Sequence, residues 1–193
     1  MFTAGDAIVH PARGVGIIER IEERPLRGEI EPFYRIKLVG AVETTVLVPV
    51  RIADEIGLRK AVSQQQLSRV WSVLRDEPQQ LPDDHKERYE ILEVKLDSGD
   101  VYRITEVVRD MTWREHQSGQ LNTVGKRMHQ RALDLLAGEV ATALKIEVDQ
   151  AACDIREVLS NCLAAYDAEQ PIDCAPIECS RPDKPVRRPH ATK

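Results

Sequence analysis

The period of the hydrophobic pattern changes once along the chain, close to Pro49. Before that point, short runs rich in Val, Ile, Tyr and Leu are separated by Gly and Pro, a pattern typical of β-strands. After it, apolar residues recur every three or four positions, as they do on one face of an α-helix. The sequence therefore predicts an α+β protein, with a small antiparallel β module of Tudor-like or SH3-like kind followed by an all-helical domain.

We divide the 193 residues into three parts. Residues 1–60 are the predicted β module and residues 61–168 the predicted helical domain, with the change of period between Arg51 and Ser63. Residues 169–193 contain five prolines and few large apolar side chains, so a disordered tail is expected there.

Each helix predicted after the β module has a capping residue at its start and an apolar stripe along it. The first stripe comprises Leu67, Val70, Trp71 and Leu74 behind Ser63 as the cap, which predicts that Trp71 lies in the core. Later helices are expected to start at Asp83 or Asp84, at Asp100, at Asn122 or Thr123, and at about Asp149.

The charge of the chain limits how it can meet its partners. With 27 Lys and Arg against 32 Asp and Glu, the formal net charge is -5 at pH 7. Because neutralisation of phosphates by cations supplies non-specific affinity for nucleic acid, any contact with DNA should be local or assisted by another protein. No apolar run approaches the roughly 18 to 20 residues of a membrane span, so we expect a cytoplasmic protein without membrane contact.

No complete catalytic or metal-binding motif is found in the sequence. The segment from Gly119 to Lys126 resembles a phosphate loop but has one residue too many, and Arg127 stands where Ser or Thr would hold magnesium. Reduced thiols are expected, because all the cysteines lie in the last quarter of the chain without the tight spacing of zinc ligands: Cys153, Cys162, Cys174 and Cys179. We therefore expect a protein that is not an enzyme and has no metal or cofactor.

A specific signature occupies the start of the chain. The run FTAGDAIVHPARGVGIIERIE, from Phe2 to Glu22, closely resembles the RNA-polymerase-interaction module shared by CarD, CdnL and transcription-repair coupling factor. The resemblance covers roughly residues 1–165 and continues at 46–50, 57–59, 98–101, 107–110 and 126–128. Because the helical half is similar too, and no helicase motor follows, the chain resembles a stand-alone CarD/CdnL protein.

The resemblance implies a transcription regulator that binds RNA polymerase. In this family the β module places its sheet edge beside an edge of the polymerase β subunit, and an open sheet suits that task because its edge has unpaired N–H and C=O groups. Alternatively, Arg24 is a solvated charge and Leu47 part of the core. The residues that the resemblance assigns to polymerase binding are Arg24, Val46, Leu47, Val48 and Pro49.

The resemblance also implies contact with promoter DNA at the upstream edge of the bubble, which stabilises the open complex. At about 100° per residue, position 113 projects nearly opposite the apolar face that contains Ile104 and Met111, so Trp113 is predicted to point away from the core. In the family, a Trp near this point wedges against the bases. The residues assigned to DNA are Arg109, Trp113, Arg114, Lys126 and Arg127, with Arg131 nearby, although some of these cations could instead pair with Glu.

Thr112 looks like a residue inserted before the Trp. An unbroken helix would then rotate Trp113 by about 100°, whereas a helix that frays at Thr112 would leave it in place. The alternative function is an adaptor that binds polymerase and recruits another protein through its helical half. An exposed Trp113 beside cations favours DNA contact, and a buried one favours the adaptor. The expected partners are the RNA polymerase β subunit and promoter DNA, and the free protein is expected to be monomeric and to reach the nucleoid through the polymerase.

Overall fold

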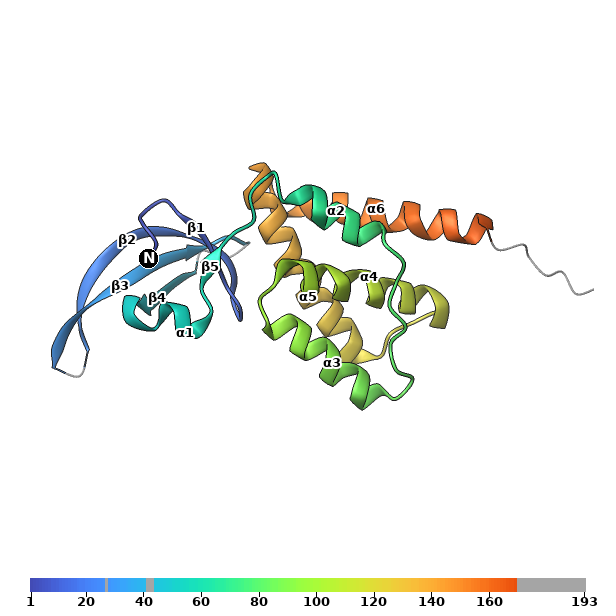
Figure 1. Cartoon of the computed structure of the whole chain (residues 1–193), viewed down its shortest axis with the longest axis horizontal. Helices are drawn as coiled ribbons and strands as arrows, with labels where there is room; N and C mark the ends of the chain where they lie inside the picture. The colour runs from blue at the N-terminus through green and yellow to red at the C-terminus, as the bar shows by residue number, and fades with distance from the viewer. Residues whose placement is uncertain (27, 41–43, 170–193) are drawn as a thin grey trace, which may run out of the picture.

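The computed structural model of the chain describes residues 1–26, 28–40 and 44–169. A twisted sheet lies at one end of the molecule and a bundle of longer helices at the other (Figure 1). The α+β prediction is confirmed, because an antiparallel five-stranded sheet precedes the helical bundle. Among the described helices, none has both the length and the apolar character needed to cross a membrane. The predicted tail, 169–193, lies outside the described residues except for Glu169.

The sheet has the strand order β4-β3-β2-β1-β5. Its strands are β1 (Ala7–His10), β2 (Gly14–Leu26), β3 (Glu29–Leu38), β4 (Thr45–Pro49) and β5 (Arg59–Lys60). One face of the sheet carries a small core of Ile8, Ile18, Tyr34, Ile36 and Val48. After a 3₁₀ turn at Val50–Ile52, Ala53 of the short helix α1 (Ala53–Ile56) and Leu58, which follows that helix, complete this core. Four residues are too few to show a helical period, so the sequence pattern did not predict α1.

A β-bulge in β2 determines which side chains reach the other face of the sheet, which we call the outer face. Ile18 pairs with Ile36, but Arg20 pairs with Arg35, so one extra residue, Glu19, stands between the two pairs. Because side chains alternate between faces, this extra residue exchanges the faces of everything that follows. Arg20, Glu22 and Arg24 thereby reach the outer face.

The helical half contains α2 (Leu67–Arg75), α3 (His85–Asp97), α4 (Val101–Ser118), α5 (Thr123–Leu144) and α6 (Val148–Glu169). Three predicted caps are confirmed, because the side chains of Asp84, Asp100 and Asn122 accept hydrogen bonds from backbone N–H groups of the first turns. The predicted cap at Ser63 is wrong. Ser63 lies in a turn before α2, where its N–H donates to Oε1 of Gln66 over 2.9 Å, and Gln66 is the N-cap.

A second, larger core fills the space between these five helices. Leu74, Leu92, Met111, Leu136 and Ile155 are among its fully buried members, one from each of α2 to α6. Trp71, predicted to lie in the core, packs against this cluster but is only half buried. Burial of aliphatic side chains is thus the main source of stability in a protein that has few aromatic residues.

The two halves are joined by a seam between the sheet and α5. The guanidinium of Arg59 donates to both carboxylate oxygens of Glu139, at 2.5 and 2.9 Å, and to the carbonyl of Gly99. Glu139 is only 1% exposed and also accepts the N–H of Val62. A bidentate pair whose carboxylate is buried constrains orientation as well as distance, so it limits how the sheet can turn relative to the bundle.

Candidate functional site

The edge strand β4 is the first candidate surface. It pairs with β3 on one side, and its other side faces no strand of the described chain. Val46 and Val48 turn toward the core of the β module, whereas Leu47 and Pro49 alternate onto the outer face, where both are half buried. A partner strand beside β4 would therefore meet its backbone directly and the side chain of Leu47 from one face only.

Arg24 and Leu47 share the outer face, although they lie on strands that do not touch. Arg24 Nε donates to Glu22 Oε1 over 2.7 Å, and Arg35 Nη1 lies 3.8 Å from the same oxygen. Arg35 is in turn the cross-strand neighbour of Leu47. Hydrogen bonds from Arg24 and Arg20 lower the pKa of Glu22, which keeps this carboxylate ionised. The structure thus links the predicted residues through Glu22 and Arg35, which the sequence did not single out because the bulge at Glu19 leaves no signal in the pattern.

Trp113 does not occupy the exposed position predicted for it. Helix α4 runs unbroken to Ser118, and Thr112 is part of its regular turn, with Oγ1 donating to the Val108 carbonyl over 2.7 Å. The helix therefore does not fray, and the rotation that it imposes turns the Trp inward. Trp113 is 7% exposed and packs edge-to-face on Tyr166 of α6, with ring centroids 4.6 Å apart. In this conformation it cannot wedge between bases.

Arg109 is also withdrawn from solvent, contrary to its predicted contact with phosphates. Its guanidinium donates to Asp110 Oδ1 over 2.8 Å and to the carbonyl of Val73, and the side chain is 4% exposed. Asp110 Oδ1 accepts the N–H of Gln79 as well, whereas Oδ2 has no hydrogen-bond partner. Burial raises the pKa of Asp110 even though Arg109 lies beside it. Arg109 therefore has a structural role, since it ties α4 to the end of α2.

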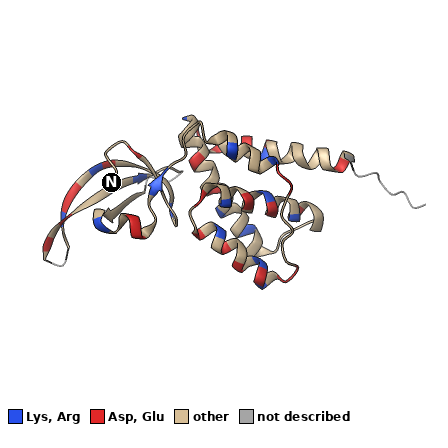
Figure 2. Ribbon diagram, in the orientation of Figure 1, with Lys and Arg blue, Asp and Glu red and all other residues tan. Residues whose placement is uncertain are grey.

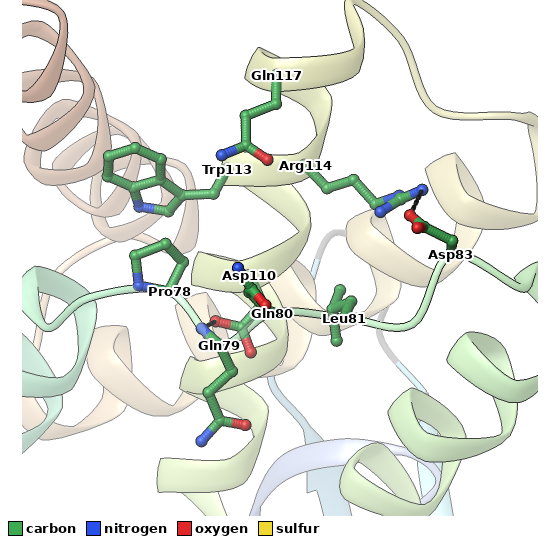
Figure 3. Close-up of a pocket in the computed structure, with 9 residues that line it drawn as sticks. All are labelled: Pro78, Gln79, Gln80, Leu81, Asp83, Asp110, Trp113, Arg114 and Gln117. Carbon is green, nitrogen blue, oxygen red and sulfur yellow. Dashed lines mark hydrogen bonds and ion pairs between the residues drawn. The ribbon is translucent and has the colours of Figure 1, made fainter. Parts of the chain in front are cut away.

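A hollow of about 290 Å³ lies beside Asp110 and Trp113, between α4 and the segment 78–83. Figure 3 shows Trp113 and Asp110 on its wall and Arg114 extending toward Asp83. The Arg114 guanidinium lies 4.0 Å from the Asp83 carboxylate, and the Arg114 side chain is 28% exposed. Such a loose pair at the surface is weak and leaves Arg114 available to a stronger anion.

The remaining predicted cations lie at the start of α5. Lys126 and Arg127 are exposed in its second turn, and no described residue forms an ion pair with either of them. Asn122 caps this helix end, and the Tyr89 hydroxyl donates to the Asn122 side chain over 2.6 Å, which fixes the turn against α3. Lysines and arginines are dispersed over the molecule and mixed with acidic residues (Figure 2), so only local clusters can attract an anion.

Residues that could bind a metal are not clustered in the described part of the chain. No group of three His, Cys, Asp or Glu side chains there could hold an ion. Cys153 and Cys162 are free thiols on α6. The other two cysteines, Cys174 and Cys179, lie outside the described residues.

Comparison with known proteins identifies both halves. Residues 2–62 match the model of the CarD-like/TRCF RID domain, and residues 69–156 match that of the CarD C-terminal domain. The chain is also 31% identical over 142 residues to YdeB of Bacillus subtilis (strain 168), which is named as a transcription factor. That alignment covers 72% of this chain and 90% of YdeB. The chain belongs to the CarD/CdnL family. The resemblance noted in the sequence is thereby confirmed, and this CarD-family protein is a transcription factor.

The residues that bury Trp113 can be placed relative to the matched family domain. The matched range ends at residue 156, within α6, and the remaining turns of that helix extend beyond it. Those turns supply Tyr166 and also Asp167, whose carboxylate lies 3.1 Å from His116 Nε2. Trp113 is therefore buried by a part of this CarD-family chain that lies outside the matched domain.

Proposed function

We propose that this CarD-family protein binds the β subunit of RNA polymerase through the β4 edge and contacts promoter DNA at the upstream edge of the bubble, so that the open complex lasts longer. The observation that carries the proposal is the edge itself. Five residues, Thr45–Pro49, present a backbone that pairs with no described strand on one side. An edge of this kind accepts a strand from a partner, and the match to the RID domain supports polymerase as that partner.

Affinity and selectivity have different sources in this proposal. Backbone hydrogen bonds along β4 give affinity without regard to sequence. Leu47 and Arg24 on the outer face give selectivity, and Arg24 is already oriented by Glu22. Val46 and Val48 serve through their backbone, because their side chains belong to the β-module core.

The DNA contact rests on the exposed cations Lys126 and Arg127 at the start of α5. Arg114, on α4, is a third candidate. These few charges on an acidic chain should give weak binding that declines steeply with salt. Polymerase bound at β4 compensates by holding the cations near the promoter, which raises their effective concentration.

The test is capture of the polymerase β subunit by the full-length Leu47→Glu variant. The variant should lose at least about tenfold in affinity, because an unpaired carboxylate would be buried in the contact. Val94→Glu is the matched control, since Val94 is a 66% exposed apolar residue on α3, and it should capture normally. Equal capture by both variants would exclude the β4 edge as the binding surface.

A second function, an adaptor, is favoured by the burial of Trp113. If the helical half recruits a protein and does not contact DNA, Lys126→Glu with Arg127→Glu should leave the lifetime of the open complex unchanged while polymerase capture stays normal. Under the proposal, the same double variant shortens that lifetime. Promoter opening followed with a fluorescent base, with the wild-type protein in parallel, distinguishes the two functions.

A further inference from the structure

Three arginines from two separate parts of the chain line one groove. The groove lies in the seam between the β module and α5 and measures about 410 Å³. Arg13 reaches it from the turn between β1 and β2, and Arg127 and Arg131 reach it from one face of α5. Its apolar lining includes Val15, Leu135 and Gly138. Neither the β module nor α5 would form this surface alone.

The turn that carries Arg13 is held tightly against α5. Gly14 has a φ of +82°, which glycine adopts without strain, and a Cβ there would lie 3.4 Å from the Leu135 side chain, so the turn lies against α5. His10 Nδ1 accepts the N–H of Ala12 over 3.2 Å, and the carbonyl of His10 accepts the N–H of Arg13. Burial and the charge of Arg13 lower the pKa of His10, which favours the neutral ring that this hydrogen bond requires. Arg13 is thus presented on a preformed turn.

The charges around the groove leave an excess of cations. Arg13 and Arg127 are exposed, and neither forms an ion pair with any described residue. Arg131 pairs with Asp97 at 3.1 Å, but both side chains are well exposed, which makes the pair weak. Among the described residues of the lining, the one acidic group is Asp134, whose Oδ1 accepts from the Gln130 amide over 2.7 Å. Guanidinium groups are well suited to bind phosphate, because their planar pairs of donors match two phosphate oxygens.

We infer that the groove between the β1–β2 turn and α5 is a phosphate-binding site, in which Arg13, Arg127 and Arg131 bind a phosphate group of the DNA backbone or of a free nucleotide. In its DNA form the inference rests on the proposed function and extends it, because it adds the polymerase-binding module to the DNA contact. Arg13 is the distinguishing residue, since it lies in the β module and belongs to no other predicted contact.

The experiment compares the full-length protein with its Arg13→Ala, Arg127→Ala and Lys126→Ala variants in two binding assays. The first assay measures fluorescence anisotropy of a labelled duplex with a short unpaired segment, over a series of salt concentrations. The second measures binding of inorganic pyrophosphate and of GTP by calorimetry. Arg103→Ala is the control, because Arg103 is exposed on α4 and lines no part of the groove. A thermal melt of each variant verifies that it is folded.

If the phosphate belongs to DNA, Arg13→Ala and Arg127→Ala should each weaken duplex binding and reduce the slope of log K against log salt by about 0.9, while Arg103→Ala changes neither. If it belongs to a free nucleotide, Arg13→Ala and Arg127→Ala should both abolish binding of pyrophosphate or GTP. In the duplex assay, Arg13→Ala should then bind like the wild-type protein, whereas Arg127→Ala should still bind more weakly because of its proposed DNA contact. Wild-type behaviour of Arg13→Ala in both assays overturns the inference. In that case a loss with Lys126→Ala still supports the proposed DNA contact, and a duplex affinity that none of the variants alters counts against that contact.

Discussion

The outer face of the sheet and the interior of the helical bundle use the same ion-pair chemistry in opposite ways. On the sheet, Arg24 and Glu22 are joined at 2.7 Å with 47% and 16% of their side chains exposed. In the bundle, Arg109 and Asp110 are joined at 2.8 Å with 4% and 0% exposed. A solvated pair exchanges partners at little cost, whereas a buried pair is a fixed part of the structure. Availability to a partner is therefore decided by what covers an arginine, and not by its presence in the sequence.

The largest expected effect comes from breaking the buried pair. Asp110→Ala should lower the free energy of unfolding by about 3 to 5 kcal/mol, because it leaves Arg109 buried without its carboxylate. Urea unfolding of the full-length protein measures this loss. Asp83→Ala, at the fully exposed partner of Arg114, should leave the midpoint unchanged within error. Equal midpoints for the two variants would contradict the contrast between buried and solvated pairs.

The substitution Trp113→Ala should have the next largest effect on the free energy of unfolding. Because Trp113 is enclosed by Tyr166 and the α4 core, its removal should leave a cavity and cost about 3 kcal/mol or more. A Trp that pointed into solvent would lose far less. Thermal unfolding of Trp113→Ala and Tyr166→Ala, measured together, tests the contact from both sides, and a wild-type melt for both would restore the exposed position that the sequence predicted.

A smaller effect is expected from lowering the pH. Burial lowers the pKa of His129 below its ordinary 6.5, and the ring lies 3.0 Å from Thr112 Oγ1. The unfolded chain then binds a proton at a higher pH than the folded protein does. The free energy of unfolding should therefore fall as the pH is lowered through 6.5, and should be highest above that value. Urea titrations across this range should show that the free energy of unfolding depends less steeply on pH in His129→Gln than in the wild-type protein, with His10 supplying part of what remains. The same pH dependence in both proteins would exclude His129 as a source.

The smallest effect on stability is expected at the sheet. Arg24→Ala should leave the unfolding midpoint of the protein unchanged, since its pair with Glu22 is solvated. It should nevertheless weaken capture of the polymerase β subunit, because the guanidinium lies on the same outer face as Leu47. Arg75→Ala, on α2, is the matched exposed arginine and should affect neither measurement. A destabilised Arg24→Ala variant with normal capture would reverse the assignment.

Local features were predicted well from the sequence, and features that depend on distant partners were not. Asp84, Asp100 and Asn122 bond to backbone within three residues, so their capping roles follow from neighbours in the chain. The orientation of Trp113 depends on Tyr166 in another helix, which no periodicity in α4 reveals.

The arginines show the same limit within a single helix. Arg109 looked like a surface cation because it falls on the polar side of the α4 pattern. It is buried because the carbonyl of Val73 and the segment around Gln79 close over it. The sheet edge, by contrast, was predictable in outline. Pro49 has no N–H to donate to a neighbouring strand, so the run of β-forming residues that it ends is best placed at an edge of the sheet.

The Arg59–Glu139 pair bears on the spacing between the two proposed binding surfaces. Because the pair limits how the sheet can turn relative to α5, it also limits the distance from the β4 backbone to the first turns of α5. If polymerase binds at β4 and DNA at α5 as proposed, no flexible hinge between the two surfaces has to lose entropy when the second contact is made. A complex in which polymerase and DNA lie at a different spacing would then be engaged at one surface only, so spacing would add to the selectivity that each surface has by itself.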